Sequence, residues 1–287
     1  MTRYVIITPV RDEEVYIAAT IESVCQQTIL PAEWIIVDDG SSDRTGEIID
    51  RYAAQLSWIR AIHRTNRGFR KAGSGVIEAF YDGYHELRCN DWELIVKLDG
   101  DLTFPPTYFE NCLAHFRSEP RLGIGGGDIY HRFAGNLKLE QNPRFHVRGA
   151  TKIYRRACWE AIGGLFTAPG WDTIDEVKAN MLGWKTYSFP ELRLVHHRLT
   201  GTSDGLLRDR VKHGVACYVC GYHFLFVAAS CLRRLTQRPY VCGSVAMLSG
   251  FLKGYLTHAP RMSDTQVVNY LRNQQLRRLC GLETIWK

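Results

Sequence analysis

Residues 96–104 read VKLDGDLTF and complete an apolar segment that predicts a buried strand. Asp99 and Asp101 lie at the end of this strand, and Gly100 between them would let a ligand approach the backbone closely. Carboxylate oxygens, completed by substrate phosphates, are the usual protein ligands of Mg²⁺ or Mn²⁺. The stretch therefore predicts a site for a metal ion and a diphosphate, with a solvated surface turn as the alternative.

The segments around this stretch alternate between strands and helices. We expect strands at 3–10, 33–40, 59–64 and 92–101, and helices at 13–27, 41–56 and 75–87. This alternation predicts an α/β fold with a mainly parallel sheet covered on both faces. Because ligands bind beyond the carboxyl ends of such strands, residues 9–13, 38–42 and 99–101 should converge on one crevice.

The second of these segments lies in VDDGSSD, residues 37–43. Its Asp, Gly and Ser residues predict a turn that caps a helix beginning near Arg44. They also suit a nucleotide pocket, in which Asp38 or Asp39 would accept hydrogen bonds from the base and the ribose. The turn and the pocket are compatible, so both interpretations stand.

Two other glycine-rich stretches exclude rival nucleotide-binding classes. GIGGGD at 123–128 has Asp128 where a dinucleotide fingerprint needs its last glycine. GFRKAGS at 68–74 has the glycine spacing of a P-loop but Ser74 in place of its lysine. The sequence therefore supports neither a dinucleotide dehydrogenase nor a P-loop NTPase.

Composition limits the partners and the compartment. The net charge of +6 is spread over 287 residues, so a nucleic acid partner is not indicated. Nine cysteines without framework spacing predict reduced thiols, and the pair Cys217 and Cys220 predicts core or interface positions. The first residues lack the pattern of a secretory signal peptide. We therefore expect a cytoplasmic protein.

From about residue 205 the sequence turns to long, mostly apolar helical patterns. The run 214–232 has no formal charge and is long enough to be tested as a membrane span. A buried helix is the favoured interpretation, or a helix on the membrane surface whose Arg233, Arg234 and Arg238 face phosphates. Residues 271–282 suit an amphipathic helix. These helices could contact the inner face of a membrane, a second copy of the chain, or the protein's own core.

Five motifs occur in order along the chain. They are ITPVRDEEVYI (7–17), WIIVDDGSSDRT (34–45), VKLDGD (96–101), IGG (162–164) followed by GWDTIDE (170–176), and VHHR (195–198). Together they resemble a bacterial family 2 glycosyltransferase over about residues 3–200. The resemblance implies a GT-A fold with a mainly parallel, Rossmann-like sheet over residues 1–204, followed by a helical extension over 205–287. It also implies Mg²⁺ or Mn²⁺ and transfer of a sugar from a nucleotide-diphosphate donor with inversion.

The resemblance also implies roles for particular residues. In the first-strand motif Asp12 stands where the family usually has Asn, and Arg11 stands where an aromatic residue is common. The metal ligands would be Asp101, the principal one, with Asp99 and His197, which we prefer to His196. The donor-binding residues would be Thr8, Pro9, Arg11, Glu13, Asp39, Lys71 and Asp99.

The catalytic base is expected in an acidic pair at the start of a helix that ends at a Gly-aromatic pair. Counting back from Gly183 places Asp172 at the second acidic position, with Trp171 at the first. Asp175, followed by another carboxylate, is the second choice one turn later. A helix N-cap is the alternative role for Asp172.

These roles describe a hexosyltransferase that uses a UDP-sugar and an acceptor hydroxyl on a glycan or a lipid-linked precursor. An alternative of another class is a catalytically silent nucleotide-sugar binding or scaffold protein with the same fold. A nucleotidyltransferase is a third possibility, but residues 8–14 lack the glycine-rich loop that it needs. A homo-oligomer is also compatible with the apolar helices.

Overall fold

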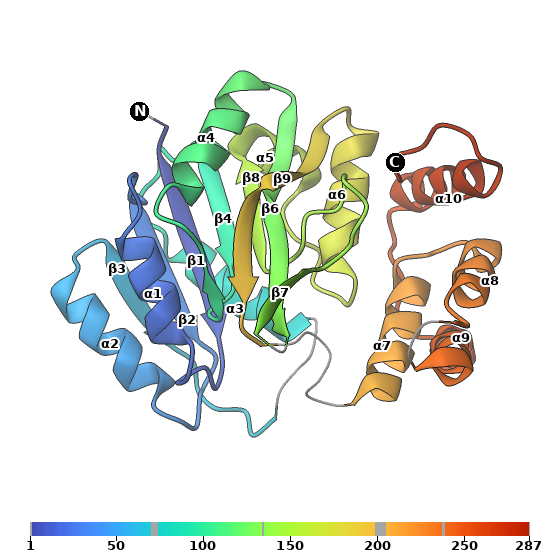
Figure 1. The fold of residues 1–287 in the computed structure, drawn as a ribbon, viewed down its shortest axis with the longest axis horizontal. Coiled ribbons are helices and arrows are strands. Elements are labelled where there is room, and N and C mark those ends of the chain that lie inside the picture. The colour runs from blue at the N-terminus through green and yellow to red at the C-terminus, as the bar shows by residue number, and fades with distance from the viewer. Residues whose placement is uncertain (1, 70–73, 134, 199–204, 237–238, 287) are drawn as a thin grey trace.

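The computed structural model describes residues 2–69, 74–133, 135–198, 205–236 and 239–286. Within these residues nine strands form one sheet in the order β3-β2-β1-β4-β8-β6-β9-β5, and β7 pairs with β6 (Figure 1). The first half is parallel and consists of β1 (Tyr4–Val10), β2 (Glu33–Asp38), β3 (Ile59–His63) and β4 (Leu94–Leu98). The strands predicted in this half are confirmed.

The second half of the sheet is mixed. It contains β5 (Leu102–Thr103), β6 (Leu122–Phe133), β7 (Asn136–Leu139), β8 (Thr151–Arg155) and β9 (Lys185–His196). β8 runs antiparallel to both β4 and β6, whereas β6 and β9 are parallel. The strand next to β4 is therefore β8, which comes late in the chain and runs opposite to the four parallel strands.

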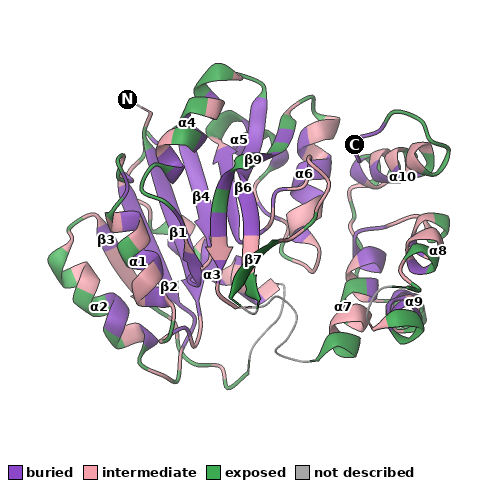
Figure 2. Ribbon diagram, in the orientation of Figure 1, coloured by how far each residue is buried: buried purple, intermediate pink, exposed green. Residues whose placement is uncertain are grey.

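Helices cover both faces of the sheet, as the alternating pattern predicted. One face packs against α1 (Ile17–Cys25), α2 (Thr45–Gln55) and α4 (Tyr108–Ser118). The other packs against α3 (Ser74–His85), α5 (Arg156–Ile162) and α6 (Trp171–Met181). Successive strand side chains point to opposite faces, so Ile6 joins one core and Ile7 the other. Figure 2 shows the resulting band of buried residues along the central strands.

Four further helices form an extension beside the sheet domain (Figure 1). They are α7 (Leu206–Val219), α8 (Phe224–Arg233), α9 (Tyr240–Leu256) and α10 (Thr265–Leu279). α7 and α9 pack closely because both carry glycines at the contact. A Cβ at Gly214 would lie 1.9 Å from the carbonyl oxygen of Met247, and one at Gly250 would lie 2.1 Å from that of Val211. The division at residues 204 and 205 stays a prediction, since 199–204 lie outside the described residues.

The uncharged run 214–232 is not one helix. It is divided between α7 and α8, and Gly221 at the break has a φ of 78°. In the described part of the chain, every helix is too short or too polar to cross a membrane. Leu271 of α10 is buried with Val177 of α6. The amphipathic helix predicted at 271–282 therefore meets the protein's own core on one face.

All nine cysteines are free thiols, and Cys217 and Cys220 are buried. Their predicted place in the core is confirmed.

Candidate active site

The loops after β1 and β2 are joined by direct hydrogen bonds. The amide of Asp39 donates to the carbonyl of Val10 at 2.8 Å, and the amide of Ser42 donates to the carboxylate of Asp12 at 2.8 Å. Asp12 has a φ of 54°, a left-handed conformation that Asn and Asp tolerate better than most residues. Asp can therefore take the backbone conformation at a position where the family usually has Asn. The predicted convergence of these two segments is confirmed.

Asp39, at the end of β2, is buried and is bound by two arginines. Arg64 donates to its Oδ1 at 2.5 Å, and Arg67 donates to the same atom at 2.9 Å. Arg11 donates to the carbonyl of Asp39 at 2.8 Å. The sequence analysis missed Arg64 and Arg67. They follow the end of β3, so the strand-end rule applied to that strand would have found them.

The carboxylate of the neighbouring Asp38 contacts the backbone of the turn and the side chain of His63. Its carboxylate accepts from the amide of Ser41 at 2.9 Å and lies 3.2 Å from Nδ1 of His63, whose Nε2 lies 2.9 Å from Asp50. Partial burial lowers the pKa of His63, but the two carboxylates outweigh burial and raise it. Asp38 therefore shapes the turn rather than facing the crevice freely.

The other predicted donor-binding residues lie on β1 and in the loop that follows. Thr8 is fully buried, and its hydroxyl accepts from the indole of Trp34 at 2.8 Å. Pro9 is also buried within β1. Glu13 accepts from Arg198 at 2.8 Å, which ties the end of β9 to this loop. Lys71 lies outside the described residues. The donor contacts of all these side chains stay predictions.

The two carboxylates of the opening motif meet a histidine. Asp99, Asp101 and His196 each offer one ligand atom, and these atoms lie within 4.8 Å of one another. Nε2 of His196 is 3.0 Å from Oδ2 of Asp101, while its buried Nδ1 has no hydrogen-bond partner among the described residues. Two carboxylates and an imidazole with a spare nitrogen fit Mn²⁺ or Mg²⁺.

Burial alone would lower the pKa of His196, but the hydrogen bond and negative charge of Asp101 outweigh burial and raise it. The protonated form would pair with Asp101, whereas ligation of a metal ion would require the neutral imidazole.

The structure places His196, and not the expected His197, beside the two carboxylates. Nε2 of His197 is 2.8 Å from the hydroxyl of Thr103, and its ring stacks on Tyr16 at 5.7 Å. The pairing of β5 with β9 places His196 opposite Leu102, the residue after Asp101. Adjacent residues in extended backbone point to opposite sides, so the one next to the carboxylates is His196.

The presence of glycine at position 100 is explained by packing, and not by the close approach of a ligand that we expected. A Cβ at this position would lie 2.4 Å from Val10 and 3.2 Å from Ile17. The glycine is thus required because β1 and α1 pack against the turn, and ligand approach is not needed to explain it. On the other side of the turn, buried Lys97 pairs with Asp99 and lies 5.4 Å from the ring centroid of Trp171.

Asp172 lies in the first turn of α6, whose N-cap is Gly170 with a φ of 86°. Gly170 rather than Asp172 occupies the cap position, so the capping alternative is wrong. The carboxylate is 26% exposed, and its nearest ion-pair partner, Arg148, is 3.9 Å away. Burial raises the pKa of Asp172, but the positive charges of His146, Lys152 and Arg148 outweigh burial and lower it. Asp172 is therefore ionised at neutral pH.

Asp175, the second choice, has a different environment. It is fully buried, with both carboxylate oxygens 2.9 Å from Nζ of Lys152 and one accepting from Tyr154 at 2.5 Å. Burial raises its pKa to about 6, although Lys152 opposes the shift. Glu176 also binds Lys152, at 2.9 Å. These contacts hold α6 against β8 and leave Asp175 no access to a substrate.

The group formed by Asp99, Asp101 and His196 is connected to Asp172 through residues 149 and 150. The amide of Asp99 donates to the carbonyl of Ala150 at 2.8 Å. A Cβ at the preceding Gly149 would lie 3.2 Å from Cβ of Asp172. The two acidic centres therefore flank the same short segment at the start of β8.

Residues 5–169, more than half of the chain, match the family described as Glycosyl transferase family 2. The chain belongs to glycosyltransferase family 2. Its match ends just before Asp172, so the role of that residue depends on the geometry of this chain and on motif spacing.

Two relatives and one solved structure support membership of the family. EpsH of Bacillus subtilis (strain 168), named as a glycosyltransferase, is 32% identical over 77% of this chain and 68% of its own length. The uncharacterized glycosyltransferase EpsJ of the same strain is 39% identical, but over 27% of this chain and a quarter (25%) of its own length. The mannosyltransferase PcManGT from Pyrobaculum calidifontis, in complex with GDP-Man and Mn²⁺, has a TM-score of 0.58 and 15% identity over 98% of this chain and 76% of its own. This likeness shows that the family 2 chain has the GT-A fold.

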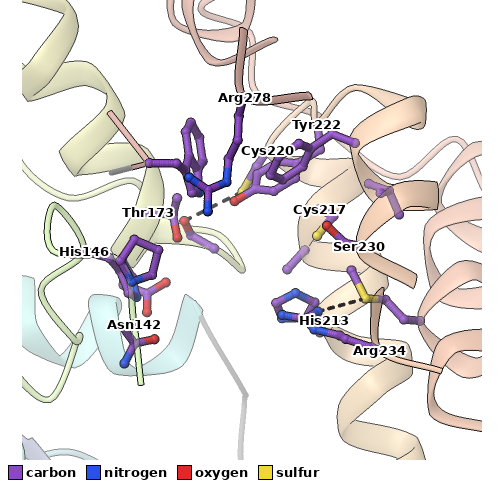
Figure 3. A pocket seen from close by; sticks show the side chains of 18 of the residues that line it. Asn142, His146, Thr173, His213, Cys217, Cys220, Tyr222, Ser230, Arg234 and Arg278 are labelled. Carbon is purple, nitrogen blue, oxygen red and sulfur yellow. Dashed lines mark hydrogen bonds between the residues drawn. The ribbon is translucent and has the colours of Figure 1, made fainter. Parts of the chain in front are cut away.

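Next to Asp172 the family 2 domain meets the helical extension. A cavity of about 400 Å³ lies there, lined by Asp172 and His146 on one side and by α7, α8 and α10 on the other. Figure 3 shows Asn142, His146 and Thr173 on one wall, facing His213, Cys217, Tyr222 and Arg234 on the other. The extension thus completes the surroundings of the candidate base.

Proposed function

We propose that this chain transfers a hexosyl group from a nucleotide-diphosphate donor, with uridine as the base, to an acceptor hydroxyl, with inversion and with a divalent metal. One observation carries the proposal. Asp172 and the cluster of Asp99, Asp101 and His196 lie on either side of residues 149 and 150. An ionised carboxylate and a candidate metal site thus flank one crevice at the carboxyl ends of the parallel strands.

Asp101, Asp99 and His196 would hold Mg²⁺ or Mn²⁺. When bound, such an ion stabilises the negative charge that develops on a leaving diphosphate. Lys97, which pairs with Asp99, and Arg198, which binds Glu13, add positive charge to the same end of the crevice. At the other end, Asp39 would accept hydrogen bonds from the nucleobase while Arg64 and Arg67 keep its carboxylate in place.

Asp172 would accept the proton of the acceptor hydroxyl as that oxygen attacks the anomeric carbon. Its lowered pKa keeps it unprotonated at neutral pH, so it is ready to act as a base. General-base assistance of this kind contributes about 10²- to 10⁴-fold to the rate. Attack opposite the leaving diphosphate inverts the anomeric carbon in one step, and no enzyme nucleophile is needed.

The acceptor would enter from the cavity between α6 and the extension, which Asp172 faces. We propose a glycan or a lipid-linked precursor as the acceptor. Large apolar side chains are exposed on α8 and α9, among them Leu232, Val245 and Leu256. They suit a peripheral contact with a membrane, and a second copy of the chain is the competing partner for the same residues.

The direct test is release of the nucleoside diphosphate by the purified chain with Mn²⁺ and a panel of UDP-sugars. Wild-type protein should release UDP slowly from its donor, and Asp172→Asn should bind the donor but release much less. A wild-type protein that binds a UDP-sugar and never releases UDP, with or without acceptor extracts, would favour the silent binding protein instead.

A further inference from the structure

The cavity beside Asp172 contains an excess of arginine side chains. Arg233 and Arg234 are neighbours at the end of α8, and Arg278 lies on α10, more than forty residues later in the sequence. Figure 3 shows Arg278 reaching into the cavity from above, with Arg234 on the opposite wall from His146. Tertiary packing brings Arg278 to the cavity that the adjacent pair Arg233 and Arg234 also lines.

These arginines lack carboxylate partners in the described parts of the chain. Arg234 has one polar contact, from its Nη1 to the sulfur of Met247 at 3.4 Å. Asp172 is the one carboxylate among the described residues that line the cavity, and it already faces Arg148. The cavity therefore carries positive charge that its own side chains leave uncompensated.

The titration behaviour of the neighbours agrees with this excess of charge. Burial lowers the pKa of Arg234, and the positive charges of Arg210 and Arg233 lower it further. The cavity walls, with the charges of Arg234 and Arg210, also lower the pKa of His213 to about 4. An anion that entered the cavity would therefore meet a positive electrostatic potential.

We propose that Arg233, Arg234 and Arg278 bind a phosphate or diphosphate group carried by the acceptor. Guanidinium groups match phosphate oxygens in charge and in bidentate geometry, and hydrogen bonds between two charged groups are the strong ones. The hydroxyls of Ser230 and Tyr222 line the same cavity as further donors. The assignment of this phosphate to an acceptor rests on the proposed function, but phosphate binding itself does not require turnover.

A second cavity of about 520 Å³ adjoins the first and shares Arg233 and Arg278 with it. Its other lining residues include the apolar Ala229, Leu279 and Leu282 and one carboxylate, Glu283. A phosphate at the shared arginines would have Asp172 on one side and this more apolar groove on the other. An acceptor whose phosphate is attached to an apolar chain would fill both cavities, and a water-soluble phosphorylated glycan would fill the first alone.

The test compares pyrophosphate with decyl diphosphate by isothermal titration calorimetry. Both titrations contain EDTA, so the cluster of Asp99, Asp101 and His196 cannot bind diphosphate through a metal ion. The variant is Arg233→Gln with Arg278→Gln. Its matched control is Arg208→Gln with Lys253→Gln, which removes two exposed positive charges from α7 and α9, outside both cavities.

We expect saturable binding of diphosphate to the wild-type protein, weakened at least tenfold in the cavity variant and changed less than twofold in the control. Added salt should weaken wild-type binding, because the attraction is electrostatic. Tighter binding of decyl diphosphate than of pyrophosphate would identify a lipid source for the phosphate, and equal binding a soluble source. Absence of binding to the wild-type protein, or equal losses in the two variants, would overturn the proposal.

Two further measurements separate this inference from the proposed function. The cavity variant should keep its melting temperature and its binding of UDP with Mn²⁺, because its arginines lie away from the donor crevice. Asp172→Asn should keep or strengthen diphosphate binding, since it removes the carboxylate from the cavity, while it lowers turnover by about 10²- to 10⁴-fold. Diphosphate binding that survives when no donor is turned over would leave the phosphate site standing and the transferase activity refuted.

Discussion

Replacing Asp172 and Asp175 in turn by Asn separates catalysis from folding, because the two carboxylates lie one turn apart in opposite environments. Asp172 is 26% exposed and 3.9 Å from its nearest ion-pair partner. An ion pair of that kind is worth roughly 0–1 kcal/mol, so Asp172→Asn should leave the melting temperature nearly unchanged. Its loss as a general base should lower kcat by about 10²- to 10⁴-fold.

Asp175→Asn should instead lower the melting temperature and leave the general base in place. It removes the negative charge and one of the two oxygens that lie 2.9 Å from fully buried Lys152, one of which also accepts from Tyr154, while Glu176 remains 2.9 Å from the same ammonium. Breaking a buried ion pair costs about 3–5 kcal/mol, and the remaining Glu176 places this variant near the lower end, at about 3 kcal/mol. At roughly 2–4 °C per kcal/mol, the melting temperature should fall by roughly 6–12 °C.

The assay measures nucleoside diphosphate release with Mn²⁺ at a temperature where both variants are folded by circular dichroism. Donor binding, followed by calorimetry, is the control and should be retained in Asp172→Asn. Our reasoning would be refuted if Asp172→Asn kept kcat within threefold of wild type while folded Asp175→Asn lost it. That result would identify Asp175, one turn further along α6, as the base, and Lys152 would then have to release Asp175 during the reaction.

Three further predictions test other parts of the site. His196→Ala should raise the Mn²⁺ concentration needed for half-maximal donor binding at least tenfold, whereas His197→Ala should change it little; equal effects would return the histidine choice to an open question. Gly149→Ala places a Cβ 2.9 Å from the ring of Trp171 and 3.2 Å from Cβ of Asp172, so the start of α6 must shift and kcat should fall at least tenfold while donor binding is kept; an unchanged kcat would show that the helix adjusts freely. The pKa of His63 is raised in the folded protein, so its stabilising contribution is complete below its ordinary value near 6.5 and is lost as the pH rises through the folded value. The melting temperature of wild type should therefore exceed that of His63→Gln most near pH 6 and least near pH 8, and a constant difference would contradict the assignment.

Much of the fold could be predicted because its signals are local. The β-branched run at residues 3–10 and the apolar run before Asp99 each predict a strand without reference to the rest of the chain. The rule that ligands bind at the ends of parallel strands then brought Asp12, Asp39 and Asp101 toward one crevice. The contacts between the β1 and β2 loops confirm that step for Asp12 and Asp39.

Other features depend on pairings between distant segments, which no local pattern reports. The antiparallel insertion of β8 between β4 and β6 has no signature in the sequence of β8 itself. Arg64 and Arg67 could be recognised as partners of Asp39 only after β3 was placed beside β2. The arginines of the cavity come from two helices whose packing the sequence left open.

The sequence by itself determined the order of the strands and helices of the first half, the family, and the acidic residues at the strand ends, since these depend on periodicity and spacing along the chain. The tertiary structure decided which member of each neighbouring pair faces the candidate site. His196 and not His197 faces Asp101 because β5 and β9 pair in one register. Asp172 faces an open cavity while Asp175 is sealed against Lys152, because α6 packs on β8 with one face and looks toward the extension with another.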